Sequence, residues 1–206
     1  MKDLFKNFTL FVALSIIFSA LTACRPTSSS PQGPVDETKS NSVTAETKKT
    51  DESGYPPPPA GIAQAEIKMV DGSTFKLEEK KGKVILFNLW GIWCGPCIQE
   101  MPHLIELQEK YKDKNFEIIG LNVGDEDGQP ETAENINAFV QKHNLNYQIG
   151  YADRKLFEEF ARVSKLAGVP QSVLINRSGK MINIFAGGGP NVINSLKETV
   201  AKEMSE

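Results

Sequence analysis

Residues 84–97 read VILFNLWGIWCGPC, an almost unbroken apolar run that leads into two cysteines spaced C-x-x-C. An apolar run without polar alternation is typical of a strand that is buried on both faces of a sheet. The residues that follow place apolar side chains at helical spacing, which predicts a helix from about Cys94 or Gly95 to Tyr111. We therefore expect the cysteine pair to lie where a buried strand turns into a helix.

The spacing and position of Cys94 and Cys97 suit reversible disulfide chemistry. Three residues apart at the start of a helix, the two sulfurs come within bonding reach across the first turn. The amino end of a helix carries partial positive charge and unpaired N–H groups, which favour a thiolate. We predict that Cys94, nearer the exposed end, is the attacking nucleophile and that the more buried Cys97 resolves the mixed disulfide. Pro96 has no N–H to lose in a first helical turn, and its fixed φ keeps the loop rigid.

Other uses of a cysteine pair match this sequence less well. A zinc site needs about four ligands, and His103 and His143 stand at no recognised spacing from the cysteines. Attachment of c-type haem requires a histidine directly after the second cysteine, where this chain has Ile98. Sco-like copper-delivery proteins use C-x-x-x-C, and peroxiredoxins carry Thr or Ser three residues before their cysteine, where this chain has Gly91. A purely structural disulfide remains as an alternative, and we expect neither a metal nor a cofactor.

The core-forming residues lie between about Gly61 and Glu206, which is enough chain for one domain. Turn signals at Asp71-Gly72 and Ser178-Gly179 predict two hairpins. Strands and helices alternate between them, so we predict an α/β fold in which helices flank a central mixed sheet. The predicted strands are Ala65–Val70, Thr74–Leu77, Val84–Trp90, Phe116–Val123, Tyr147–Gly150, Gln171–Asn176 and Met181–Phe185, and the further helices are Thr132–His143, Arg154–Ala161 and Asn191–Ala201.

The first residues have the form of an export signal. Lys2 and Lys6 precede an uncharged, mostly apolar run from Phe8 to Ala23, which is shorter than the roughly 20 residues that a membrane-spanning helix needs. The run ends in LTAC, which resembles the lipobox of bacterial lipoproteins. That resemblance implies cleavage after residue 23, a lipidated Cys24 as the first mature residue, and a location in the cell envelope outside the cytoplasm. Such a compartment permits disulfide chemistry.

Residues 24–60 are expected to form a lipidated tether. From Arg25 to Ala60 the chain has 11 Ser/Thr and seven of its 12 prolines, and it lacks the apolar side chains that a core requires. We interpret this stretch as a flexible spacer that includes a short polyproline II segment at Pro56–Pro59. The organisation is then a signal over 1–23, a tether over 24–60 and a domain over 61–206. With 23 basic and 26 acidic residues, the net charge of −3 argues against a nucleic-acid partner.

The string NLWGIWCGPC over 88–97 resembles the active site of thioredoxins. Together with Val169-Pro170, the turn at Gly179-Lys180 and the export signal, it is most similar to TlpA/ResA-type membrane-anchored thiol-disulfide oxidoreductases. The resemblance covers residues 61–206 and implies a thioredoxin-like fold with an N-terminal hairpin and an inserted helix and strand, here about 132–150. It also implies a cis-proline loop at Val169-Pro170 beside the cysteines, which would expose the backbone of Val169 to a substrate strand.

The same resemblance implies a mostly apolar rim around the Cys94 sulfur that binds an extended peptide. Its expected members are Ile92, Trp93, Gly95, Pro96, Val169, Pro170 and Gly187.

Glu100 is the third candidate catalytic residue. Six residues before their first cysteine, thioredoxins carry a buried aspartate that manages a proton, but this chain has Asn88, which cannot accept one. Glu100 faces the same side of the helix as Cys97 and matches the active-site glutamate of ResA-like proteins. We predict that Glu100 is partly buried, that desolvation raises its pKa, and that it accepts or relays the proton of Cys97. The alternative is an ordinary exposed helical glutamate.

The Gly-Pro pair between the cysteines is that of reducing thioredoxins. This pair favours a reductant or isomerase role. The resemblance implies reduction of disulfides in exported proteins, apocytochrome c among them, with electrons from a membrane thiol carrier. We expect the protein to be a monomer. A noncatalytic thioredoxin-like module that binds a partner or a metal stays open, as does a peroxiredoxin-like peroxidase. The presence of both cysteines together with Pro170 favours the oxidoreductase.

Overall fold

The computed structural model describes residues 56–206 of the chain. The predicted export signal, Cys24 and the tether up to Tyr55 lie outside the described residues. Within residues 56–206, no helix is both long enough and apolar enough to cross a membrane.

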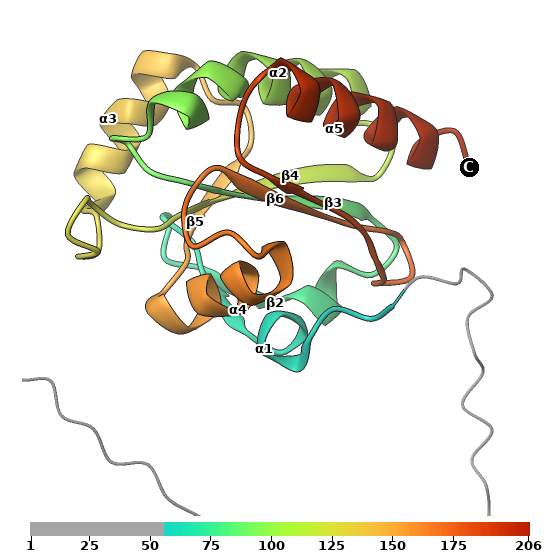
Figure 1. The fold of residues 1–206 in the computed structure, drawn as a ribbon, viewed down its shortest axis with the longest axis horizontal. Coiled ribbons are helices and arrows are strands. Elements are labelled where there is room, and N and C mark those ends of the chain that lie inside the picture. Colours follow the sequence, from blue (N-terminus) through green and yellow to red (C-terminus); the bar gives the residue numbers. More distant parts are fainter. Residues whose placement is uncertain (1–55) are drawn as a thin grey trace, which may run out of the picture. The chain divides into compact units, whose positions relative to one another are not determined.

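A five-stranded mixed sheet forms the centre of the domain, with the strand order β5-β4-β3-β6-β7 (Figure 1). The central strand β3 pairs in parallel with β4 and antiparallel with β6, while β5 runs parallel to β4 and β7 antiparallel to β6. The strands are β3 (Val84–Trp90), β4 (Phe116–Asn122), β5 (Gln148–Tyr151), β6 (Gln171–Ile175) and β7 (Met181–Ala186).

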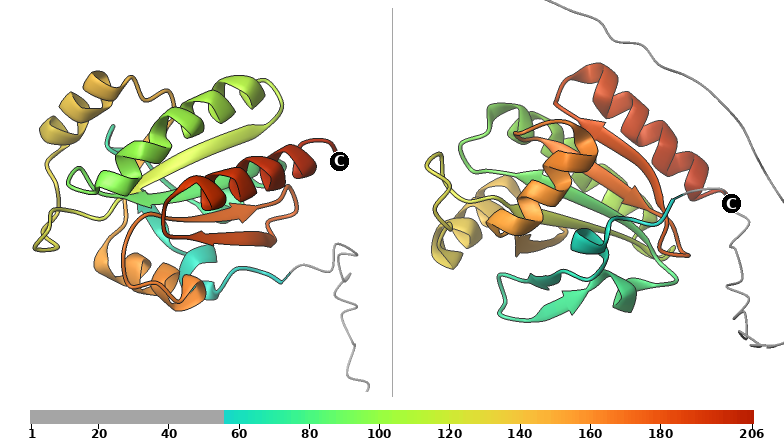
Figure 2. Two further views of the ribbon diagram at one scale, coloured as in Figure 1. Left: turned by 45° about the horizontal axis from the view of Figure 1, so that its top comes forward. Right: turned by 60° about the horizontal axis from the view of Figure 1, so that its bottom comes forward.

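Helices cover both faces of this sheet, as the three views of the ribbon show (Figures 1 and 2). One face carries α2 (Gly95–Tyr111), α3 (Ala133–His143) and α5 (Pro190–Glu203). The other carries α1 (Ala60–Ala63), the hairpin β1–β2 (Glu66–Lys68 and Thr74–Lys76), the short 3-10 helix η1 (Leu77–Lys80) and α4 (Arg154–Ser164).

The sequence of β3 explains the two-sided core. All seven side chains of β3 are buried, and because strand side chains alternate between faces, they divide between two clusters. Leu86 and Trp90 pack in the cluster that includes α2. Phe87 and Leu89 pack in the cluster that includes α4, where Phe160 meets Phe87 edge to face. The unbroken apolar run was therefore correctly interpreted as a central strand.

The predicted fold class is confirmed: this is a thioredoxin-like α/β domain with an N-terminal hairpin and with a helix and strand, α3 and β5, inserted after β4. Two short helices, α1 and η1, were not expected. Pro58 is buried, and the Pro56 carbonyl accepts a hydrogen bond from the Met181 N–H at 3.0 Å. Contacts with the domain therefore begin a few residues before Gly61.

Candidate active site

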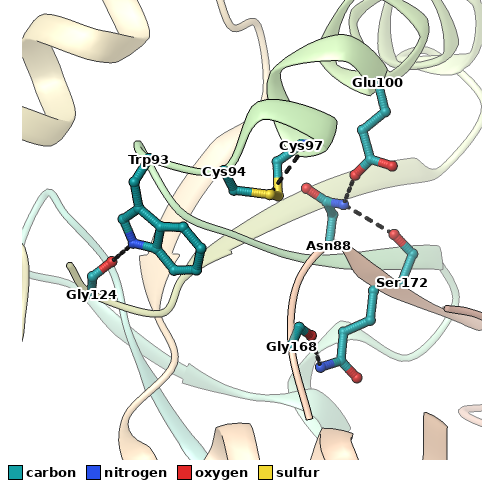
Figure 3. The surroundings of a disulfide bond; sticks show 9 residues. Asn88, Trp93, Cys94, Cys97, Glu100, Gly124, Gly168 and Ser172 are labelled. Carbon is teal, nitrogen blue, oxygen red and sulfur yellow. Dashed lines mark hydrogen bonds between the residues drawn. A yellow bond between two sulfur atoms is a disulfide. The ribbon is translucent and has the colours of Figure 1, made fainter. Parts of the chain in front are cut away.

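Cys94 and Cys97 form a disulfide at the junction of β3 and α2 (Figure 3). Cys94 is the N-cap residue of α2, and its Sγ accepts a hydrogen bond from the Cys97 N–H at 3.2 Å. This N–H belongs to the first helical turn, where the backbone donors have no partner within the helix. When the disulfide is reduced, the same donor and the positive end of the helix favour a thiolate at Cys94.

Both cysteines are enclosed. Cys97 is 0% exposed and Cys94 3% exposed, so the predicted order of burial holds, although Cys94 is less open than the sequence suggested. The loop before α5 contributes to this enclosure. A Cβ on Gly188 would lie 2.9 Å from the Pro96 Cβ and 3.5 Å from the Pro170 Cγ, so Gly188 lies against both prolines. From the sequence, the neighbouring Gly187 was expected at this position instead.

Trp93 forms one wall beside the disulfide. Its side chain is 43% exposed, and among residues 56–206 Trp93 is the one large hydrophobic residue that is exposed. The indole N–H donates to the Gly124 carbonyl at 2.9 Å, which fixes the ring (Figure 3). A Cβ on Gly91 would lie 2.7 Å from the indole, so glycine at this position leaves room for the ring.

The loop before β6 also lies close to the cysteines. The Val169-Pro170 peptide bond is cis, as the resemblance implied. Among the described residues, neither the N–H nor the C=O of Val169 has a hydrogen-bonding partner. Gly187, with a φ of +81°, donates its N–H to the Pro170 carbonyl at 2.9 Å. Gly187 therefore holds the cis-proline loop in place.

Glu100 lies on α2 one helical turn after Cys97 and is only 4% exposed. Its Oε1 accepts a hydrogen bond from Asn88 Nδ2 at 2.6 Å, and the same amide donates to Ser172 Oγ at 3.1 Å (Figure 3). Burial raises the pKa of Glu100 to about 7, against the opposing effect of the Asn88 hydrogen bond. The predicted burial and raised pKa of Glu100 are confirmed. The contact with Asn88 was missed, because Asn88 had been considered only as a residue unable to take a proton.

A groove of about 1550 Å³ opens beside Trp93 and Val169. The carboxyl ends of the parallel strands β3, β4 and β5 meet at one edge of the sheet, and the segments that follow β4 and β5 line the groove. Eight acidic and three basic residues face it. Asp125 accepts hydrogen bonds from the N–H groups of Asp127 and Gln129 and so caps its own turn. Within residues 56–206, no three His, Cys, Asp or Glu side chains come close enough to hold a metal.

The fold and the site together define a thioredoxin-like domain with a C-x-x-C disulfide at a helix start, opposite a cis-proline. The chain belongs to the Redoxin family, which matches it over residues 58–201. It is similar to the thiol-disulfide oxidoreductase ResA of Bacillus thuringiensis, with 36% identity over 121 residues that cover 57% of this chain and 63% of the relative. It is also similar to ResA of Bacillus subtilis, with 27% identity over 118 residues, 57% of this chain and 60% of the relative.

The matched region thus spans a little less than two thirds of the length of these relatives. Among solved structures, a solution structure from Bacteroides thetaiotaomicron matches with a TM-score of 0.59 at 26% identity, covering 69% of this chain and 86% of that one. A thiol:disulfide interchange protein of the thioredoxin family from Chlorobium tepidum matches with a TM-score of 0.58 at 22% identity, over 75% and 99% of the two chains. The latter similarity shows the fold alone.

Proposed function

We propose that this protein is a thiol-disulfide oxidoreductase that acts outside the cytoplasm and reduces disulfides in exported proteins. One observation carries the proposal: the Cys94–Cys97 disulfide lies at the start of α2, and Gly188 packs against both Pro96 and Pro170, which brings the cis-proline loop with Val169 close to the cysteines. The similarity to relatives that carry the name thiol-disulfide oxidoreductase supports it. The Gly-Pro pair between the cysteines favours the reducing direction.

The reaction begins with the reduced protein. The Cys94 thiolate attacks one sulfur of the substrate disulfide, a mixed disulfide forms, and the other substrate sulfur leaves as a thiolate. Cys97 then loses its proton and attacks the Cys94 sulfur. The Cys94–Cys97 disulfide forms, and the substrate leaves with both of its sulfurs reduced. Two electrons pass to the substrate, and a membrane thiol carrier returns two electrons to the protein.

Glu100 is proposed as the group that takes the proton of Cys97. It lies one helical turn after Cys97 on the same side of α2, and Asn88 holds its carboxylate (Figure 3). A buried acid with a pKa of about 7 is suited to both accepting and releasing a proton near neutral pH. An exposed glutamate with an ordinary pKa would be a weaker base for a thiol.

Val169 and Trp93 are proposed to bind the substrate chain. An extended segment that pairs with the N–H and C=O of Val169, which have no partner within residues 56–206, would lie as an added strand beside the disulfide. Trp93 offers an exposed apolar surface in the same groove. Gly95, Pro96, Pro170 and Gly187 complete the proposed rim, and apocytochrome c is a substrate of suitable chemistry. We further propose that Cys24 carries the lipid anchor that keeps the protein, as a monomer, in the cell envelope.

Trapping the mixed disulfide tests this proposal. In the full-length Cys97→Ala variant, Cys94 has no internal thiol to release it, so we expect disulfide-linked adducts after exposure to oxidised exported proteins. The matched Cys94→Ala variant should form few adducts, because Cys97 is fully enclosed. Adducts are counted by non-reducing electrophoresis and identified by mass spectrometry.

A redox titration of the wild type separates an exchange site from a structural crosslink. We expect a potential between roughly −200 and −280 mV together with turnover of a protein disulfide. A potential below about −300 mV, with no turnover and no adducts, would instead identify a structural disulfide.

A further inference from the structure

Polar atoms gather in the apolar core between α2 and the sheet. Asn88 Oδ1, Trp90 Nε1 and the Tyr147 hydroxyl are buried, and none of them has a hydrogen-bonding partner among residues 56–206. Unpaired buried polar groups are costly, so native structures usually satisfy them with protein or water. These three atoms belong to the core region that encloses the Glu100 carboxylate.

Gly120 brings this polar cluster together. On β4 it pairs with Asn88 of β3 on one side and with Ile149 of β5 on the other. A Cβ on Gly120 would lie 3.0 Å from Trp90 Nε1 and 3.1 Å from the Tyr147 Cε2. The edges of the indole and of the phenol therefore occupy the space that a side chain at position 120 would fill. That space lies next to Asn88, whose amide holds Glu100.

Tyr147 is the only member of this cluster, besides Glu100, with a dissociable proton. It comes from the segment just before β5 and is buried in the core under α2. Burial and, to a smaller extent, the negative charge of Glu100 raise the pKa of Tyr147. The phenol therefore remains protonated and keeps a hydrogen that it can donate.

Few other titratable groups face Glu100. From α2 itself there is Cys97, which does not titrate while it is in the disulfide. β3 and β6 contribute only the neutral Asn88, Trp90 and Ser172. Elsewhere on α2, His103 and Glu106 contact Lys197 of α5, and His143 of α3 stacks on Phe139.

We propose that Tyr147 is a positioning residue for Glu100. Its hydroxyl donates a hydrogen bond to one buried water, and this water donates to the Glu100 carboxylate. Trp90 Nε1 and Asn88 Oδ1 bind the same water. A water in such a place would have four polar partners, within the range of two to four that buried waters usually find. Donation to the carboxylate stabilises its charged form and so opposes the effect of burial. That Tyr147 thereby influences proton transfer from Cys97 rests on the proposed function. The expected effect of Tyr147 on the pKa of Glu100 does not.

Substituting Tyr147 with Phe removes only the hydroxyl. In the oxidised full-length protein labelled with carbon-13 at its glutamate carboxyls, the Glu100 signal is assigned by its loss in Glu100→Gln and titrated. We expect the pKa of Glu100 to rise in Tyr147→Phe by about 0.4 to 1 unit, the size of one neutral hydrogen bond. The alkaline shift should also appear in the pH dependence of disulfide reduction.

Tyr111→Phe is the matched control, because Tyr111 is buried in the same core but lies 11 residues further along α2. It should leave the titration of Glu100 unchanged. Replacing the tyrosines with 3-fluorotyrosine keeps every ring and makes the phenol a stronger donor, so the pKa of Glu100 should fall. An unchanged or lowered pKa in Tyr147→Phe would overturn the proposal. If the titration shifts as expected but no disulfide is reduced, the proposed function fails and this inference stands.

Discussion

At the scale of single residues, Glu100 combines burial with a specific neutral partner. Ordinarily a carboxyl this enclosed is paired with a cation, but Glu100 is held by the amide of Asn88. An amide donor stabilises the carboxylate less than a lysine or arginine would, so the pKa remains near 7. Asn88 thus keeps the proton of Glu100 exchangeable.

This raised pKa predicts a pH-dependent stability. An acid whose pKa is higher in the folded protein binds its proton more tightly there. Protonated Glu100 therefore contributes to the free energy of unfolding below pH 4.5, its pKa in the unfolded chain, and this contribution is lost as the pH rises through about 7. We expect the ionisation of Glu100 to lower the free energy of unfolding by about 3 kcal/mol between pH 4.5 and 8. Glu100→Gln should remove this decline.

Urea unfolding of the oxidised proteins at pH 5 and pH 8 measures the effect. Glu198→Gln, which replaces an exposed carboxyl on α5, serves as the control and should retain the wild-type pH dependence. Equal pH dependence in the wild type and Glu100→Gln would contradict the assignment.

Sequence spacing was sufficient to place Cys94 and Cys97 at a helix start, whereas Glu100 was singled out by the resemblance to ResA-like proteins. Tyr147 and Gly188 could not be found in this way. Tyr147 reaches the site from an inserted segment, and Gly188 matters only because the loop before α5 folds back onto Pro96. Such contacts depend on the tertiary structure and leave no periodic signal in the sequence.

At the scale of elements, α3 and α4 could be predicted because each has an apolar face and a capping side chain. Thr132 caps α3 by accepting from the Asn135 N–H, and Asp153 caps α4 by accepting from the Leu156 N–H. The four-residue elements α1 and η1 are too short to show a period, which is why they were missed. The active site, in contrast, lies where a long helix meets a loop, because the start of α2 rests against the loop before α5.

This contact predicts that Gly188→Ala is destabilising. The added methyl would lie 2.9 Å from the Pro96 Cβ, and the proline ring cannot rotate away. We expect a loss of about 1 to 3 kcal/mol in the free energy of unfolding, typical of overpacking. Gly168→Ala is the matched control, because a Cβ there meets nothing within 4 Å and the backbone is not in the left-handed region.

The loss is measured as a lower denaturant midpoint with an unchanged slope. Equal midpoints for the two alanine variants would show that the loop gives way and that Gly188 is not a constraint on α2.

At the scale of the whole molecule, charge is unevenly distributed around the disulfide. The net charge of the chain is only −3, yet the groove beside Trp93 has eight acidic and three basic residues. Between Asn115 and Gln141 the sequence contains no lysine or arginine. The electrostatic potential near the site is therefore negative, which favours the approach of cationic substrates.

The rate of disulfide reduction should then depend on salt according to the charge of the substrate. With the reduced full-length protein, we expect the rate toward a dicationic small disulfide such as cystamine to fall several-fold as ionic strength rises from about 0.01 to 0.15 M. The rate toward a dianionic disulfide should rise, and a neutral one should change little. Stopped-flow measurement of each pseudo-first-order rate provides the comparison.

Charge reversal locates the source of this effect. Glu126→Lys with Asp127→Lys, in the groove, should weaken the salt dependence, whereas Glu78→Lys with Glu79→Lys, on η1, should leave it largely in place. The same salt response for cationic and anionic disulfides would rule out steering by the groove.

The contacts at Pro56 and at the hairpin have a consequence for solubility. The outer strands of the sheet are β5 and β7, and an outer strand offers free backbone groups to any neighbouring chain. Here the Val70 N–H donates to the Ile149 carbonyl on β5, and the Pro56 carbonyl accepts from Met181 on β7. Proline cannot supply the N–H groups that would continue a ladder. Both edge strands of the sheet are thus protected from edge-to-edge aggregation. The backbone of Val169 remains as a place where an extended substrate segment can pair with the domain and react with the disulfide.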